Sequence, residues 1–136
     1  MLYLETSAAV KALIEEPGSA VIRLLLASNG SVATSRATQP EARAALAAAE
    51  RVRRITPAEH REAKEKLARI LAWLYIVELD EFVAESAGDI AERFSLRGFD
   101  AIHLASALRL DAPVLATWDA DLIRAGRRAG VAVATG

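Results

Sequence analysis

The sequence predicts an α/β fold with three layers, in which a mainly parallel sheet is covered by helices on both faces. Short, nearly continuous apolar segments alternate along the chain with longer helical segments, which is typical of such a sheet. The composition, with 53% hydrophobic and 26% charged residues, is that of an ordinary globular protein. Because 136 residues fit one domain and no repeat or low-complexity linker divides them, we expect residues 1–136 to form a single domain.

The first strand and the first helix are expected at the start of the chain. Leu2–Leu4 is a short apolar run and is interpreted as a buried strand. Thr6 or Ser7 can cap a helix that runs toward Glu15. Pro17–Gly18 then breaks that helix.

The middle of the chain is predicted to be mostly helical. Its expected elements are a helix over Ser19–Ala27, a strand over Ser31–Thr34, an Ala-rich helix from about Gln39 to Arg53 and an amphipathic helix ending near Leu71. Pro40 lies in the first turn of the Ala-rich helix, where proline is tolerated. Thr56, with Glu59 three residues later, forms the capping box that opens the amphipathic helix.

The last part of the chain returns to alternating strands and helices. The expected order is a strand over Leu74–Leu79, helices over Glu81–Phe94 and Phe99–Leu110, a strand over Val114–Thr117, a helix over Asp119–Arg128 and a strand over Val131–Ala134. Gly130 provides the stop between the last helix and the last strand.

The composition excludes several kinds of site. The chain has no cysteine, so it forms neither a disulfide nor a thiolate zinc site. Together with the lack of a signal-like N-terminus, this predicts a cytoplasmic protein.

Apolar stretches such as Ile70–Val77 are far shorter than the roughly 20 residues of a membrane span, so no membrane association is expected. With a net charge of −1, nucleic acid binding would need a local basic patch.

Four acidic residues lie where predicted strands end or helices begin. Glu5 ends the first strand, Glu41 lies in the first turn of the Ala-rich helix, Asp100 opens the helix of RGFDAIHLASAL, and Asp119 follows the strand VLAT. Each one alone is explained by the helix dipole, which favours acids in a first turn. Right-handed connections between parallel strands would nevertheless bring all four to one edge of the sheet.

Four carboxylates in one pocket need protons or a cation to compensate their charge. A pair about 5 Å apart repels by roughly 3 kcal/mol at an effective dielectric of about 20. Ligand oxygens without Cys or suitably spaced His select Mg²⁺ or Mn²⁺ over zinc. Because such an ion binds phosphate oxygens and activates a water, the sequence predicts phosphodiester hydrolysis.

No other chemistry is indicated by the sequence. It contains no Ser-His-Asp order, Gly-rich phosphate loop or thiolate nucleophile. His60 is expected on an exposed, charged helix. His103, three residues after Asp100, is expected in the core or in a nearby hydrogen bond, without a catalytic role.

Four blocks of the sequence resemble, in order, the motifs of PIN-domain proteins, and most closely those of the VapC toxins. The blocks are LYLETSAAVK, ATSRATQPEARAAL, RGFDAIHLASALRL and VLATWDADLIRAGRRAGV. The resemblance implies an α/β/α PIN fold and a Mg²⁺- or Mn²⁺-dependent endoribonuclease that acts as the toxin of a type II toxin–antitoxin pair. It also implies a cognate VapB antitoxin, an RNA substrate such as tRNA, and a homodimer.

The resemblance assigns roles to particular residues. By position, the metal-binding acids of the family fall on Glu5, Glu41, Asp100 and Asp119, with Asp121 as an accessory acid, and the neighbouring hydroxyls fall on Thr6 and Thr117. Glu5 departs from the family pattern, which ordinarily has Asp there. Since Mg²⁺ demands near-octahedral geometry and a Glu carboxylate reaches one methylene further, we expect Glu5 to bind the ion less well, or through a water, and to lower activity.

Two other kinds of protein would also place acids at the ends of strands. The departure at Glu5 is consistent with a PIN-fold module that binds RNA or an antitoxin without cleaving RNA. A receiver-like phosphoacceptor domain is disfavoured, because no central acceptor Asp with a paired Lys is visible: lysine occurs only at positions 11, 64 and 66, all in predicted helices.

Overall fold

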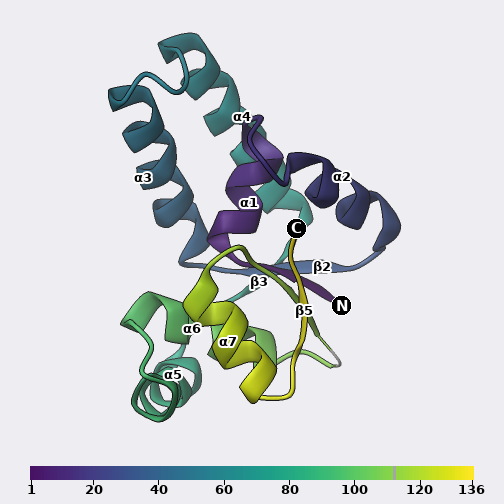
Figure 1. Ribbon diagram of the computed structural model, residues 1–136, viewed down its shortest axis with the longest axis vertical. Coiled ribbons are helices and arrows are strands. Elements are labelled where there is room, and N and C mark those ends of the chain that lie inside the picture. Colours follow the sequence, from purple (N-terminus) through teal and green to yellow (C-terminus); the bar gives the residue numbers. More distant parts are fainter. Residues whose placement is uncertain (112) are drawn as a thin grey trace.

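A central parallel sheet between two layers of helices forms the frame of the molecule (Figure 1). The computed structural model describes residues 1–111 and 113–136. Its elements in chain order are β1 (Leu2–Leu4), α1 (Thr6–Leu13), α2 (Ser19–Ser28), β2 (Val32–Ser35), α3 (Thr38–Arg51), α4 (Pro57–Trp73), β3 (Tyr75–Val77), α5 (Glu81–Phe94), α6 (Gly98–Leu108), β4 (Val114–Ala116), α7 (Ala120–Arg128) and β5 (Ala132–Ala134). None of the helices in the described residues combines the length and the apolar character of a membrane span. The predicted α/β class is confirmed.

The sheet places the first strand at its centre. The strand order is β3-β2-β1-β4-β5, and every pairing is parallel. Leu2 of β1 is in register with Val32 of β2 on one side and with Val114 of β4 on the other. Because all the strands point the same way, their carboxyl ends lie along one edge, where open α/β sheets bind ligands.

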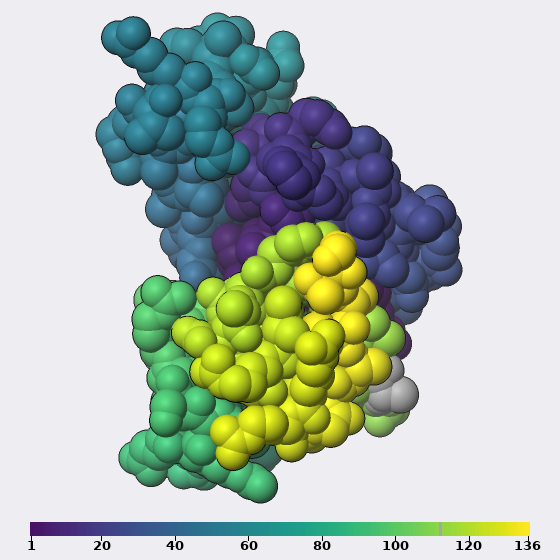
Figure 2. All heavy atoms as spheres, in the orientation of Figure 1, coloured from purple at the N-terminus to yellow at the C-terminus, as the bar shows by residue number. Residues whose placement is uncertain are grey.

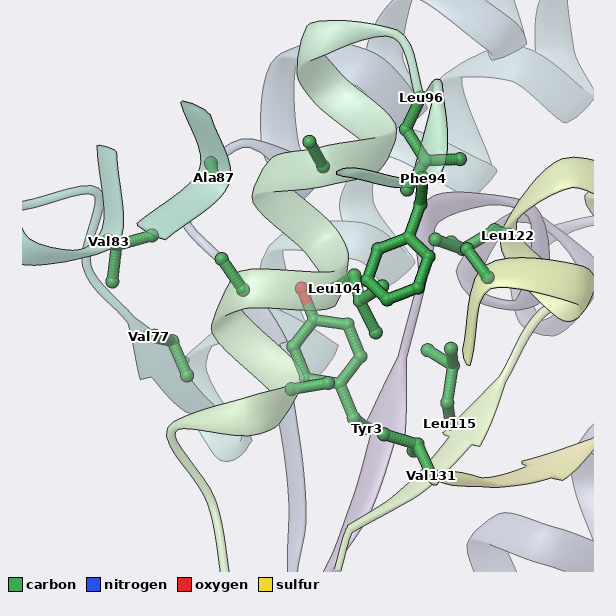
Figure 3. Packing of buried hydrophobic residues seen from close by; sticks show 14 of the residues in the cluster. Tyr3, Val77, Val83, Ala87, Phe94, Leu96, Leu104, Leu115, Leu122 and Val131 are labelled. Carbon is green, nitrogen blue, oxygen red and sulfur yellow. The ribbon is translucent and has the colours of Figure 1, made fainter. Parts of the chain in front are cut away.

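The two faces of the sheet are covered by different helices. Figure 1 shows α1 to α4 on one face and α5 to α7 on the other. Successive residues of β1 alternate between these faces: Leu2 and Leu4 join the apolar cluster under α1 and α2, whereas Tyr3 joins the cluster under α5, α6 and α7. Figure 3 shows the second cluster packed around the Tyr3 ring. All three side chains are fully buried. The strand β1 therefore contributes side chains to the apolar clusters on both faces of the sheet.

The signals that start the helices are only partly those predicted. The capping box of Thr56 and Glu59 is present at the start of α4. The predicted cap of the first helix is wrong: Glu5, and not Thr6 or Ser7, is the N-cap of α1, and its side chain accepts a hydrogen bond from the Ser7 backbone N–H. Glutamate is not a preferred N-cap residue, which is why the sequence suggested the hydroxyl residues instead.

The strand β1 has its predicted bounds, β2 is shifted by one residue, and β3, β4 and β5 are shorter than predicted. The strand expected over Leu74–Leu79 covers only Tyr75–Val77. Leu74 instead ends α4, where its N–H donates to the carbonyl oxygen of Ile70, and its side chain is buried. Apolar character alone could not separate the end of the helix from the start of the strand.

A glycine lets α7 lie close to the sheet. A Cβ atom added at Gly126 would come within 3.1 Å of Leu115 and 3.2 Å of Val133, closer than ordinary contacts. The helix therefore packs tightly on β4 and β5, and this packing fixes the β4–α7 junction, where Asp119 caps the helix.

Candidate active site

A cleft of about 580 Å³ lies at the carboxyl edge of the sheet and is lined by residues from both helical layers. Its walls come from the β1–α1 junction, α3, the start of α6 and the β4–α7 junction. The ionisable residues that line it are Glu5, Glu16, Glu41, Asp100, Asp119, Arg54 and Arg97. In Figure 2, atoms of α1 lie between those of α3 and those of the α6–α7 half of the molecule. The four acids singled out in the sequence therefore line one cleft, together with Glu16.

The Glu5 carboxylate is buried and held through one oxygen. Oε2 of Glu5 accepts hydrogen bonds from the backbone N–H of Ser7 at 3.0 Å, from the Ser7 hydroxyl, and from the Thr117 hydroxyl at 2.9 Å. The Thr117 hydroxyl oxygen also accepts a hydrogen bond from the backbone N–H of Asp119 at 3.1 Å. Thr117, which is fully buried, thus ties the β1–α1 junction to the β4–α7 junction.

The Glu41 carboxylate is also held through one oxygen. Oε1 of Glu41 accepts a hydrogen bond from the Thr6 hydroxyl at 2.7 Å and lies 2.6 Å from Nε2 of His103. Partial burial would raise the pKa of the Glu41 carboxyl, but the hydrogen bonds from His103 and Thr6 outweigh burial and leave this pKa below its ordinary value. Glu41 is therefore ionised at neutral pH.

Asp100 and Asp119 share one cationic partner. Nε of Arg97 donates to Oδ2 of Asp100 at 3.1 Å, and Nη2 of Arg97 lies 3.6 Å from Oδ2 of Asp119. The other oxygen of Asp119 caps α7, because Oδ1 accepts from the Leu122 backbone N–H at 2.9 Å. The Arg97 side chain is 77% exposed, so solvent screens both ion pairs.

The predicted site residues differ in their positions. Thr6 lines the cleft, and Thr117 contacts Glu5 from the buried side. Asp121 lies outside the cleft lining: it pairs with Arg124 at 3.0 Å in the first turns of α7, and its side chain is 54% exposed. The accessory role of Asp121 thus has less geometric support than the roles of the other six residues.

The oxygen donors of the cleft suit a hard divalent cation in kind. Among the described residues, the hydrogen bonds of Glu5 and of Glu41 converge on one oxygen of each carboxylate, which leaves the other oxygen for a ligand. Within residues 1–111 and 113–136, however, no three acidic or imidazole groups are spaced closely enough to hold an ion together. Arg97 provides the counter-charge for two of the acids, so joint binding of a cation requires Arg97 to swing out and the carboxylates to close in.

The contacts that three residues make at the site were not predicted from the sequence. His103 was expected only in the core or in a nearby bond, and its partner Tyr3 is 100 positions away, so no local spacing could reveal the pair. Arg97, in contrast, is three residues before Asp100. That spacing is common for ion pairs at a helix start, and it is a signal from which the contact could have been predicted.

Comparisons with known proteins place the chain among a group of nucleases. The PIN domain family matches residues 2–128. Ribonuclease VapC49 of Mycobacterium tuberculosis is 40% identical over 136 residues, which cover 98% of this chain and 94% of the relative.

Solved structures share the fold. VapC20 of Mycobacterium tuberculosis, described as a toxin that cleaves the sarcin–ricin loop, superposes with a TM-score of 0.71 and 18% identity, covering 93% of this chain and 95% of that one. VapBC2 of Rickettsia felis, bound to a DNA fragment from its promoter, gives a TM-score of 0.69 and 19% identity, covering 100% and 99%. At these identities the two likenesses concern the fold alone.

Proposed function

Because the chain belongs to the PIN-domain family, and within it to the VapC ribonucleases, we propose that it hydrolyses RNA phosphodiester bonds in the acidic cleft with the help of a divalent cation. One observation carries the proposal: acidic side chains from four separate segments line one cleft at the carboxyl edge of the sheet. A relative of 40% identity is named as a ribonuclease, which supports the same class of reaction.

The charge of the cleft favours a cation as the mediator of RNA binding. Five carboxylates and two arginines line the cleft, and the excess negative charge would repel RNA phosphates. The ion would be held by Glu5, Glu41, Asp100 and Asp119, whose oxygens favour Mg²⁺ or Mn²⁺. When bound, such an ion supplies an activated water and neutralises charge on the leaving oxygen.

The residues of the chain prepare the cleft for this chemistry. Ser7 and Thr117 fix Glu5, while Thr6 and His103 fix Glu41. These contacts orient the two carboxylates before substrate arrives, which lowers the cost of reorganisation. Arg97 is exposed at the rim; once released from the acids, it is available to contact an RNA phosphate.

The experiment compares two aspartates with the same local role. Asp119 and Asp80 both cap helices, and their side chains accept from backbone N–H groups at 2.9 and 2.8 Å, but only Asp119 lines the acidic cleft. Asparagine is an equally good cap. We therefore expect Asp119→Asn and Asp80→Asn to affect stability alike and only Asp119→Asn to abolish Mn²⁺-dependent RNA cleavage. Loss of a ligand should exceed the 10- to 100-fold effect typical of outer-shell partners, so cleavage should fall by more than about 100-fold.

The same assay separates nuclease activity from a binding role. Chelation with EDTA should stop cleavage, and added Mn²⁺ or Mg²⁺ should restore it. The second candidate, an RNA- or antitoxin-binding module without cleavage, is favoured by the pairing of Arg97 with two of the four acids. RNA binding without cleavage at any Mn²⁺ concentration would support that candidate and overturn the nuclease proposal.

We further propose that a VapB-like antitoxin covers the cleft and that the toxin is a homodimer. A structural neighbour is a VapBC assembly. The acidic cleft favours a basic partner segment, and an arginine is the side chain best matched to carboxylates. Light scattering of the purified chain tests the dimer. Coexpression with the cognate antitoxin tests the pairing, and Glu41→Gln should weaken the complex if the cleft is the contact.

A further inference from the structure

A chain of hydrogen bonds runs from the hydrophobic core to the acidic cleft. The Tyr3 hydroxyl lies 2.8 Å from Nδ1 of His103, and Nε2 of His103 lies 2.6 Å from Oε1 of Glu41. Tyr3 and His103 are both fully buried. Figure 3 shows Tyr3 among the apolar side chains of the core, with its hydroxyl pointing toward the helix that carries Leu104.

The pattern of partners assigns a direction to these hydrogen bonds. The Tyr3 hydroxyl is fully buried among apolar side chains, a setting that favours the neutral phenol, so its O–H donates a hydrogen bond to Nδ1 of His103. Nε2 of His103 then carries the ring proton and donates to the Glu41 carboxylate, which can only accept. The Thr6 hydroxyl, 3.1 Å from Nε2, donates its own proton to the same Glu41 oxygen. Every member of the chain is satisfied in this arrangement.

These hydrogen bonds restrict the side-chain orientation of Glu41 more than its position in the first turn of α3 would. A glutamate in the first turn of a helix ordinarily keeps its side-chain rotamers free. Here two donors, from α1 and α6, hold Oε1 of Glu41, and the donor from α6 is itself oriented by Tyr3 of β1. The other oxygen of Glu41 is left for a ligand in the cleft.

The cost of the arrangement argues for a role beyond packing. Burying a tyrosine hydroxyl and an imidazole in an apolar core is unfavourable unless every polar atom is paired, and a pair of apolar residues would fill the space without this requirement. In the described part of the chain, no buried polar side-chain atom lacks a partner. The polar chain is therefore complete, and it ends on a carboxylate of the proposed site.

We propose that Tyr3 and His103 are positioning residues that hold the Glu41 carboxylate in the orientation in which it binds the divalent cation. The proposal rests on the cation role of Glu41 proposed above. His103 acts through Glu41, and Tyr3 acts through His103 by fixing which ring nitrogen donates. This is the outer-shell arrangement that orients ligands in metal sites generally.

The experiment measures Mn²⁺ binding to the EDTA-treated, RNA-free protein by isothermal titration calorimetry, with urea unfolding in parallel. His103→Asn shortens the side chain, so its amide cannot reach Glu41, whereas the amide of His103→Gln can take the place of Nε2. We expect the Mn²⁺ dissociation constant to rise by about 10- to 100-fold in His103→Asn and to stay within about 3-fold of the wild type in His103→Gln. Tyr3→Phe, which keeps the ring and is the variant most compatible with folding, should raise it by about 3- to 10-fold.

Thr34→Val is the matched control for a purely structural effect. Thr34 is fully buried, but its hydroxyl donates to the carbonyl oxygen of Leu4 and bonds to the Thr38 hydroxyl, and none of these hydrogen bonds reaches Tyr3, His103 or Glu41. The Thr34→Val protein should lose stability without a change in Mn²⁺ affinity. If His103→Asn and Tyr3→Phe fold and bind Mn²⁺ as tightly as the wild type, the positioning role is wrong while the cation site stands. If the wild type itself binds no Mn²⁺, the proposed cation site is wrong and this role with it.

Discussion

Replacing Thr117 by valine tests how strongly one buried hydroxyl holds the two halves of the cleft together. Valine keeps the shape of threonine and removes its two hydrogen bonds, the one donated to Glu5 and the one accepted from the Asp119 N–H. A hydrogen bond to a charged group contributes about 1.5–3 kcal/mol, and a stranded buried donor costs about 1–3 kcal/mol. Because Glu5 keeps its two donors from Ser7 and the effects are not additive, we expect a loss of about 2–4 kcal/mol in the free energy of unfolding.

Urea unfolding of the EDTA-treated protein, followed by circular dichroism, measures this loss. With a slope of about 2 kcal/mol per molar urea, the midpoint should fall by about 1–2 M. Thr34→Val is the control: this fully buried threonine also has two hydrogen bonds, to the Leu4 carbonyl oxygen and to Thr38, but none to an acid of the cleft. Both variants should lose stability, and only Thr117→Val should also weaken Mn²⁺ binding. A Thr117→Val protein within about 0.5 kcal/mol of the wild type would refute the reasoning, since that is the range of neutral surface changes.

Three further predictions concern single side chains. Glu5→Asp should raise Mn²⁺ affinity and RNA cleavage with little change in stability, because aspartate is a preferred N-cap and the shorter acid suits an octahedral ion better; unchanged affinity and cleavage, measured by calorimetry and a gel assay, would contradict this. Arg97→Gln should also raise Mn²⁺ affinity, because it removes the cation that pairs with Asp100 and Asp119; weaker binding in calorimetry would show that Arg97 does not compete with the ion. Burial raises the pKa of the Tyr3 phenol above its ordinary value of 10.0, so at alkaline pH the folded protein keeps a proton that the unfolded chain releases. The free energy of unfolding should therefore fall as the pH rises above about 10, by up to about 1.4 kcal/mol per pH unit from this group. Tyr3→Phe should flatten that part of the urea-midpoint profile, whereas Tyr75→Phe, at an exposed position, should not; equal alkaline slopes in wild type and Tyr3→Phe would oppose the assignment.

The fold could be predicted from the sequence because its elements are marked by local patterns. The three apolar residues Leu2–Leu4 are enough to predict the strand β1. The four residues from Thr56 to Glu59, which form the capping box, are enough to predict the start of α4. The convergence of Glu5, Glu41 and Asp119 followed from parallel topology, since each comes just after a strand or in the first turn of the helix that follows one. Asp100 starts a helix that follows another helix, so topology alone did not place it. The cleft that they line is therefore a consequence of topology more than of any single motif.

The contacts inside the cleft could not be predicted in the same way. The bonds from Tyr3 to His103 and from Thr117 to Glu5 join positions 100 and 112 residues apart, and side-chain direction across such distances depends on packing. The other difficulty was that one residue can have two roles. Glu5 is both a helix cap and a candidate ligand, and the usual preference for hydroxyl residues at N-caps concealed the first role.

The central position of β1 has a consequence for biosynthesis. Of the described strands, β1 is translated first and its neighbour β4 is translated fourth, although Leu2 pairs directly with Val114. A nascent chain that stops before β4 has Glu5, Glu41 and Asp100 but lacks the strand that completes the sheet beside them. Such truncated products also lack Asp119 and the hydroxyl of Thr117 that binds Glu5, so the acidic cleft is complete only in a chain that has been translated past β4.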